Sequence, residues 1–125
     1  MPAQRPNTAF VYLYRDADNY KKWGEVIFAG AYDDGYEEAI KEACHAYEFF
    51  VAKQVGIPEV FLWQEEGWEP TVADHGWHQF WELKPSEGEA DDVRGRSIGE
   101  FVEQIRRVGD RGRGWEVVGP GEWWD

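Results

Sequence analysis

One five-residue run in the sequence gathers side chains that bind metals and transfer protons. It contains Asp74, His75 and His78. Carboxylate oxygens and imidazole nitrogens are ligands for Zn, Mn and Fe, and imidazole also exchanges protons near neutral pH. Asp16 and Asp18 follow an expected strand and could add two more oxygen ligands. The run therefore indicates one possible function, a small hydrolase or nuclease that uses a divalent metal held by Asp16, Asp18, Asp74, His75 and His78.

The spacing within this run weighs against that function. Two histidines three residues apart on a strand lie on opposite faces, because side chains alternate along a strand. His75 and His78 converge only if the chain turns between them, and the spacing completes no known metal-binding motif. We therefore expect no catalytic residue, no metal and no cofactor, and keep the metal-dependent enzyme as the alternative.

The overall charge favours a different function. The 125 residues include 13 Lys and Arg against 25 Asp and Glu, which gives a formal net charge of −12. Such a chain repels phosphate and attracts basic proteins over a distance, so we expect a basic protein partner rather than direct nucleic-acid binding. Residues 51–93 are the most acidic part of the chain. We expect this region to contact the partner through Glu65, Glu66, Trp68, Glu69 and Asp74.

The tryptophan content agrees with a binding function. The chain has eight Trp, and a core of large side chains accounts easily for Trp63, Trp77 or Trp81. It accounts less well for the Trp residues in expected loops and in the C-terminal tail. Tryptophan is a preferred anchor of protein interfaces and also stacks on small ligands. The tryptophans in this second group are Trp23, Trp68, Trp123 and Trp124.

The only cysteine, Cys44, is expected to be a buried thiol. It shares the apolar face of an expected helix with Ile40 and Tyr47, and His45 beside it points about 100° away. A single cysteine forms no internal disulfide, which fits a reducing compartment. The sequence shows no apolar stretch of membrane-spanning length and no signal peptide, so we expect a cytoplasmic protein without a membrane partner.

The hydrophobic pattern predicts seven elements in the order strand, strand, helix, strand, strand, helix, strand. One helix begins near Asp34, with Glu37 three residues later, and the other begins after Ser97, with Glu100 three residues later. Both pairs resemble capping boxes. Gly109 is expected just beyond the end of the second helix. The expected strands are residues 9–14, 25–29, 60–63, 77–83 and 115–118, and in the fourth Trp77, Gln79, Trp81 and Leu83 are expected to share one face.

These elements predict an α+β fold with one mostly antiparallel sheet and both helices packed on one face. Residues 1–8 are expected to form a flexible arm, residues 9–118 a single domain and residues 119–125 a tryptophan-rich tail. The main functional hypothesis is a non-catalytic binding protein, such as an inhibitor, an immunity protein or an antidefence protein. Besides the metal-dependent enzyme, a further alternative is a small-ligand binder or a homodimer that uses the open sheet face.

Overall fold

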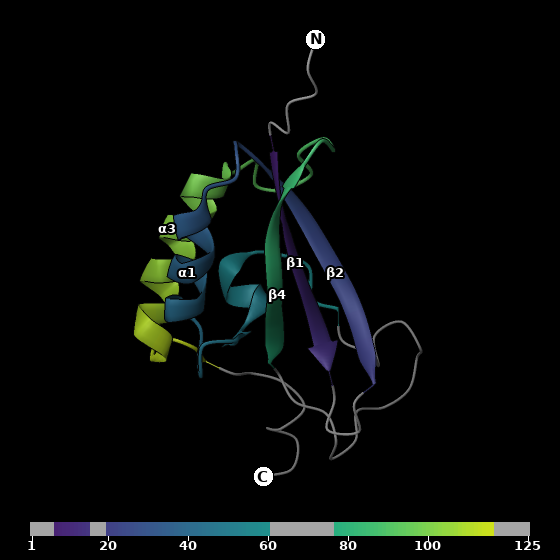
Figure 1. Ribbon diagram of the computed structural model, residues 1–125. Coiled ribbons are helices and arrows are strands. Elements are labelled where there is room, and N and C mark those ends of the chain that lie inside the picture. The colour runs from purple at the N-terminus through teal and green to yellow at the C-terminus, as the bar shows by residue number, and fades with distance from the viewer. Residues whose placement is uncertain (1–6, 16–19, 61–76, 117–125) are drawn as a thin grey trace.

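The computed structural model describes residues 7–15, 20–60 and 77–116, and it confirms the α+β class. Four antiparallel strands form one sheet in the order β2-β1-β4-β3, and two helices pack beside it (Figure 1). Strands, helices and turns follow one another as β1 (Asn7–Arg15), β2 (Lys21–Ala29), α1 (Asp34–Ala43), β3 (Phe49–Phe50), the 3₁₀ turn η1 (Ala52–Val55), β4 (His78–Ser86), α3 (Ile98–Gly109) and the 3₁₀ turn η2 (Asp110–Gly112).

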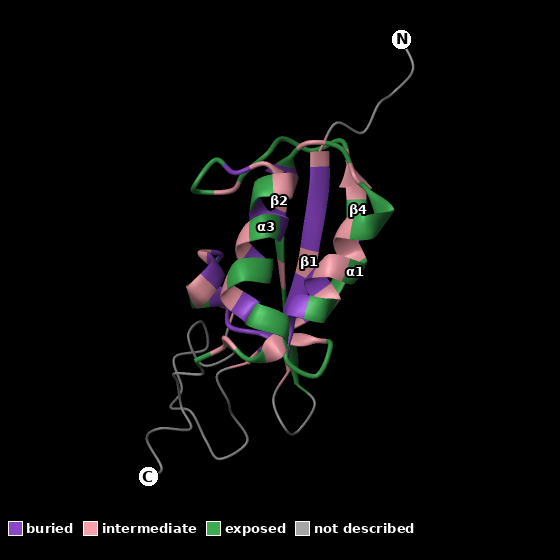
Figure 2. Cartoon of the chain, turned by 90° about the vertical axis from the view of Figure 1, so that its left-hand side faces the viewer, coloured by how far each residue is buried: buried purple, intermediate pink, exposed green. Residues whose placement is uncertain are grey.

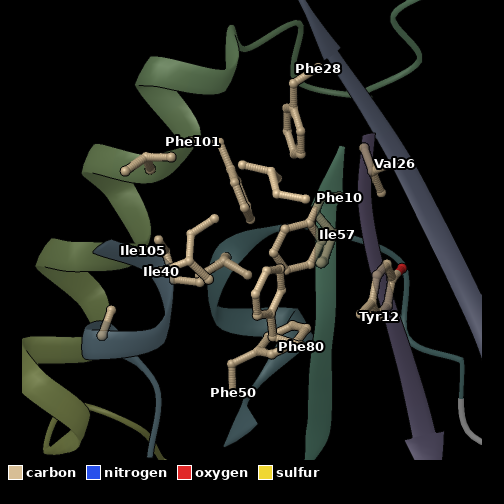
Figure 3. Close-up of a cluster of buried hydrophobic side chains, with 14 of the residues drawn as sticks. Phe10, Tyr12, Val26, Phe28, Ile40, Phe50, Ile57, Phe80, Phe101 and Ile105 are labelled. Carbon is tan, nitrogen blue, oxygen red and sulfur yellow. The ribbon is translucent and has the colours of Figure 1, made fainter. Parts of the chain in front are cut away.

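The hydrophobic core lies between the sheet and the two helices, which cover the same face (Figure 1). Aromatic rings fill much of it (Figure 3). The rings of Phe28 and Phe101 stack with centroids 4.3 Å apart, and Phe10 contacts Phe50 and Phe80 at 5.6 and 5.2 Å. Aromatic side chains of this size bury a large area each, so a chain of this length can fill its core with a few of them.

The central strand β1 is buried on both of its faces (Figure 2). Every residue from Thr8 to Tyr14 is buried except Val11, which is half-buried. Phe10 and Tyr12 point into the core, while Ala9 and Leu13 point to the face away from the helices. This second face is therefore buried along the middle of β1, although neither α1 nor α3 packs on it.

A β-bulge in β4 changes which of its residues face the core. Val11 pairs with Glu82 and Tyr12 pairs with Phe80, so Trp81 is an extra residue with no partner opposite. The expectation that Trp81 and Leu83 share a face is therefore wrong. Leu83 joins Phe80 in the core, whereas Trp81 points outward.

The two helix starts show how far local capping chemistry can be read from the sequence. The hydroxyl of Ser97 accepts the N–H of Glu100 at 3.1 Å, and the Glu100 carboxylate accepts the N–H of Ser97 at 2.9 Å. The capping box of α3 is thereby confirmed. In α1 the cap is Asp33 rather than Asp34, and its carboxylate accepts the N–H of Gly35 at 2.7 Å.

The end of α3 also differs from expectation. Gly109 is the last helical residue, with φ −71°, and the left-handed position after it belongs to Asp110, with φ 43°. Gly109 serves close packing instead, because a Cβ there would run into the carbonyl oxygen of Ala43 at the end of α1. The missing side chain thus lets the two helices approach each other.

Three further differences concern the ends of strands. β1 begins at Asn7, two residues inside the segment expected to be an arm, and β2 begins at Lys21 rather than Glu25. Phe49–Phe50 form a short edge strand that the sequence did not reveal. Val60, Trp115 and Glu116 are not in strands, and the remaining residues of the two strands expected there, 61–63 and 117–118, lie outside the described residues. So does the expected tail, 119–125.

A buried arginine connects the parts of the chain that pack around the helices. Arg96 donates hydrogen bonds to the carbonyl oxygen of Val55 at 2.6 Å, to that of Gly56 at 3.2 Å and to the side chain of Gln104 at 2.6 Å. It also pairs with Asp92. This residue therefore joins η1, the loop after β4 and α3.

Candidate protein-binding surface

Two tryptophan side chains form an exposed pair on the sheet face that the helices leave uncovered. Trp23 of β2 and Trp81 of β4 meet edge to face, with ring centroids 5.3 Å apart and planes at 86°. Their exposed fractions are 50% and 49%. Edge-to-face contact holds the two rings in a fixed arrangement, so they offer a partner a large apolar surface at little cost in side-chain entropy.

Strand geometry explains why both rings point outward. In β2, Val26 and Phe28 enter the core, so Trp23 and Glu25 must point to the other face. Trp81 follows the core residue Phe80 in β4, so alternation carries it to the same outward face. Without the bulge, strict alternation from the core residue Phe80 would carry Leu83 outward and Glu82 inward. The bulge therefore returns Leu83 to the core, while Trp81 stays on the outward face.

Leu13 of β1 lies in the row between the two strands that carry the tryptophans. It pairs with Trp23 on one side and with Gln79 on the other, and it is fully buried. Charged side chains of both signs surround this apolar centre. Lys21 and Glu25 flank Trp23 along β2, and in β4 the ammonium of Lys84 lies 3.9 Å from the Glu82 carboxylate.

Two acidic segments of the sequence, residues 16–19 and 61–76, join the sheet at the end nearest the tryptophan pair. Arg15 and Lys21, which flank residues 16–20, pair with each other two register steps beyond Trp23. The described residues on either side of 61–76 also lie together here, because the N–H of Val60 donates to Nε2 of His78 at 2.9 Å. These two segments carry the carboxylates of Asp16, Asp18, Glu65, Glu66, Glu69 and Asp74.

Among the histidines proposed as ligands, the structure describes His78 alone. Its side chain is 1% exposed and lies among the rings of Tyr12, Tyr14 and Phe50, at centroid distances of 6.0 to 6.1 Å. Because Nε2 accepts the hydrogen bond from Val60, this nitrogen is not open to a metal ion. His78 thus anchors the start of an acidic segment, together with Tyr12, whose hydroxyl donates to the carbonyl oxygen of Pro58 at 2.6 Å.

The other predicted site residues lie outside the described residues. This applies to the partner-contacting set and to the remaining metal ligands, and those predictions stay predictions. Within residues 7–15, 20–60 and 77–116, no three His, Cys, Asp or Glu side chains gather as they would around a metal ion. The residues concerned are Asp16, Asp18, Glu65, Glu66, Trp68, Glu69, Asp74 and His75.

Cys44 is buried, as expected. It is 3% exposed at the C-terminal end of α1, and burial, with the nearby charge of Glu48, raises the pKa of its thiol to about 12. The thiolate is the nucleophilic form of cysteine, so this group is inert at neutral pH. His45 stacks on Trp77 instead, with ring centroids 4.9 Å apart.

A shallow hollow of about 460 Å³ lies between the C-terminal halves of α1 and α3. A second, of about 580 Å³, adjoins it at Glu42 and Arg111. The first hollow has carboxylates and guanidinium groups in equal number, so its charge favours neither an anion nor a cation. These charged residues are Glu42, Glu103, Asp110, Arg106, Arg107 and Arg111.

Comparisons with family models, with curated proteins and with solved structures give no match, so the functional argument rests on the residues and their geometry. In the described ranges, no helix has the length and apolar character needed to cross a bilayer. Sequence reasoning singled out Trp23 as a surface anchor but placed it in a loop, and it assigned Trp81 to the core. Trp81 and Leu83 lie on opposite faces because of the bulge, for which the sequence has no glycine or proline signal.

Proposed function

We propose that this chain is a non-catalytic binding protein that engages a basic protein partner through the Trp23–Trp81 pair and the surrounding carboxylates. The observation that carries the proposal is the position of this half-exposed pair, at the end of the sheet where both acidic segments are attached. Large aromatic anchors surrounded by polar residues are typical of the centre of protein interfaces.

The carboxylates and the two tryptophans contribute to such an interface in different ways. A net charge of −12 attracts a basic partner before contact and raises the association rate, and this effect weakens as salt is added. Burial of the two indole rings then supplies short-range energy that salt does not screen. The proposed partner is therefore a basic protein, such as a nucleic-acid-binding enzyme that this chain would inhibit or neutralise in the cytoplasm.

The proposal is tested by capture of partners from nuclease-treated host lysate on the tagged full-length protein. We expect one basic protein at equal stoichiometry, with weaker retention as the salt concentration rises. Trp23→Ser and Trp81→Ser should each abolish its capture, because each removes one of the two anchors. The triple variant Glu65→Lys, Glu66→Lys, Glu69→Lys should slow association, which surface plasmon resonance can measure with the purified partner.

Val93→Ser is the matched control. Val93 is 82% exposed in the loop after β4, so the change removes an exposed apolar side chain away from the tryptophan pair and should leave capture intact. Capture of a protein that the Trp variants retain as well as the wild type does would contradict the proposal. So would a purified protein that holds one equivalent of divalent metal and loses it in His75→Ala, since that result favours a metal-dependent enzyme.

A further inference from the structure

The outer edge of β2 is covered over only half of its length. β2 is the first strand in the sheet order, so one side of its backbone faces away from β1. At Ile27 the loop after β4 covers this side. The N–H of Ile27 donates to the Asp91 carboxylate at 2.7 Å, and its carbonyl oxygen accepts the N–H of Asp91 at 2.9 Å. Ala29 beyond it bridges to Ser97.

The other half of this edge keeps its hydrogen-bonding groups available. Backbone groups alternate in direction along a strand, and β2 pairs with β1 in an unbroken register. Lys21, Trp23 and Glu25 therefore present their N–H and C=O groups in the same outward direction as Ile27. Within the part of the chain that the structure describes, the outward groups of Trp23 and Glu25 make no hydrogen bond. A row of this kind is a template for another strand.

We propose that a second copy of this chain pairs with β2 along residues 21–25, antiparallel and around a two-fold axis at Trp23. In that register each Trp23 lies opposite the second copy's Trp23, and Lys21 lies opposite the second copy's Glu25. The charges are thus complementary on both sides of the axis. An isologous interface requires this kind of self-complementarity.

The geometry of the edge fits this pairing. Lys21, Trp23 and Glu25 all have outward-facing backbone groups, so each pair of opposite residues exchanges two backbone hydrogen bonds. The pairing ends where Asp91 covers Ile27, which fixes its register. The side chains of these residues share the uncovered sheet face, where opposite pairs of tryptophans and of unlike charges stabilise antiparallel strands. This dimer does not depend on the basic partner proposed above, because two-fold pairing at the β2 edge places the tryptophan-bearing faces of both copies on the same side of one continuous sheet.

Sedimentation equilibrium of the full-length protein over a concentration series tests the inference. We expect a species of twice the chain mass of 14.6 kDa. Glu25→Lys places two lysines opposite each other on each side of the axis, and it should weaken the dimer by roughly tenfold or more. Lys21→Glu should have the same effect. The double variant Lys21→Glu, Glu25→Lys restores opposite charges and should restore the dimer.

Mixing the two single variants gives the sharpest result. Glu25→Lys and Lys21→Glu each repel their own copies, but an equimolar mixture pairs Glu with Lys at every position and should form a heterodimer. Lys84→Glu is the control, because it changes the net charge as Lys21→Glu does but lies on β4, away from the edge. A monomer at every concentration would overturn the proposal. A dimer that the single variants leave unchanged would also overturn it, since its interface would then lie elsewhere.

Discussion

Arg96 holds the carboxylate of Asp92 at two points, four residues earlier in the same loop. Its Nε donates to one oxygen at 2.9 Å and its Nη2 donates to the other at 2.8 Å, while the backbone N–H of Arg96 adds a third bond at 2.8 Å. The two side chains are 9% and 2% exposed, and the guanidinium lies 5.1 Å from the ring centre of Phe101. Two-point pairing fixes the direction of the guanidinium, which then reaches η1 and α3.

Replacing Asp92 by Asn should destabilise the fold strongly. The substitution keeps the size of the side chain but leaves a buried guanidinium without its counter-charge. We expect the free energy of unfolding to fall by about 3 kcal/mol, the lower end for a buried ion pair, because exposed residues flank Asp92 in its loop. Urea denaturation measures this fall in the free energy of unfolding. Glu103→Gln removes the exposed partner of Arg106 and should cost less than about 1 kcal/mol. Equal costs for the two variants would contradict the role of the Arg96 network.

The same ion pair predicts how stability depends on pH. Burial acts to raise the pKa of the Asp92 carboxyl, but the hydrogen bonds and the positive charge of Arg96 outweigh burial and hold this pKa below its usual value. The carboxyl therefore binds its proton more weakly in the folded state than in the unfolded state. Its contribution is complete above the unfolded pKa of about 3.9 and is lost as the pH falls through the lower folded pKa. Thermal denaturation between pH 7 and pH 2 should show the difference between wild type and Asp92→Asn shrinking at the acid end. A constant difference would contradict the assignment.

Two glycines of α3 should respond in opposite ways to alanine. Gly109→Ala places a methyl group against the backbone carbonyl of Ala43, so α1 and α3 must separate, at a cost of about 1 to 3 kcal/mol. Gly99→Ala finds its nearest neighbour, the hydroxyl of Tyr36, at 3.4 Å, and should stabilise the helix by up to about 1 kcal/mol. Thermal unfolding followed by circular dichroism compares the stability of the two variants with that of the wild type. Stabilisation by both would show that the helices do not meet at Gly109.

Cys44 should not react with thiol reagents while the protein is folded. The thiol is buried and its pKa is raised to about 12, so both access and thiolate formation are suppressed at pH 8. We expect no reaction with Ellman's reagent in buffer and one equivalent of reaction in denaturant. Rapid reaction in buffer would indicate that the end of α1 opens.

The features that the sequence predicted best are those fixed by neighbouring residues. The capping box of Ser97 and Glu100 depends on four consecutive positions, and its location is confirmed. Asp33 and Asp34 have the same side chain, and either could cap α1. The predicted N-cap, Asp34, is therefore one residue too late. Local capping chemistry thus predicted the region in which each helix begins, but not always the residue that caps it.

The features that the sequence missed depend on distant partners. Phe49 and Phe50 form a strand because Gln79 and His78, about thirty residues later, pair with them. Trp81 and Leu83 lie on opposite faces because β1 and β4 pair with one extra residue in β4. Neither feature can be recognised in the local pattern of polar and apolar residues. This explains why the fold class was predictable, whereas half of the exposed tryptophan pair was not.

The position of β1 in the sheet has a consequence for synthesis of the chain on the ribosome. β1 and β2 leave the ribosome before β4 and can pair early, since few residues separate them in the sequence. The other side of β1 pairs with β4, whose last residue is Ser86, and has to wait until that strand emerges. Until then the nascent chain exposes the unpaired edge of its central strand, and the native sheet cannot be completed before Ser86 has been added to the chain.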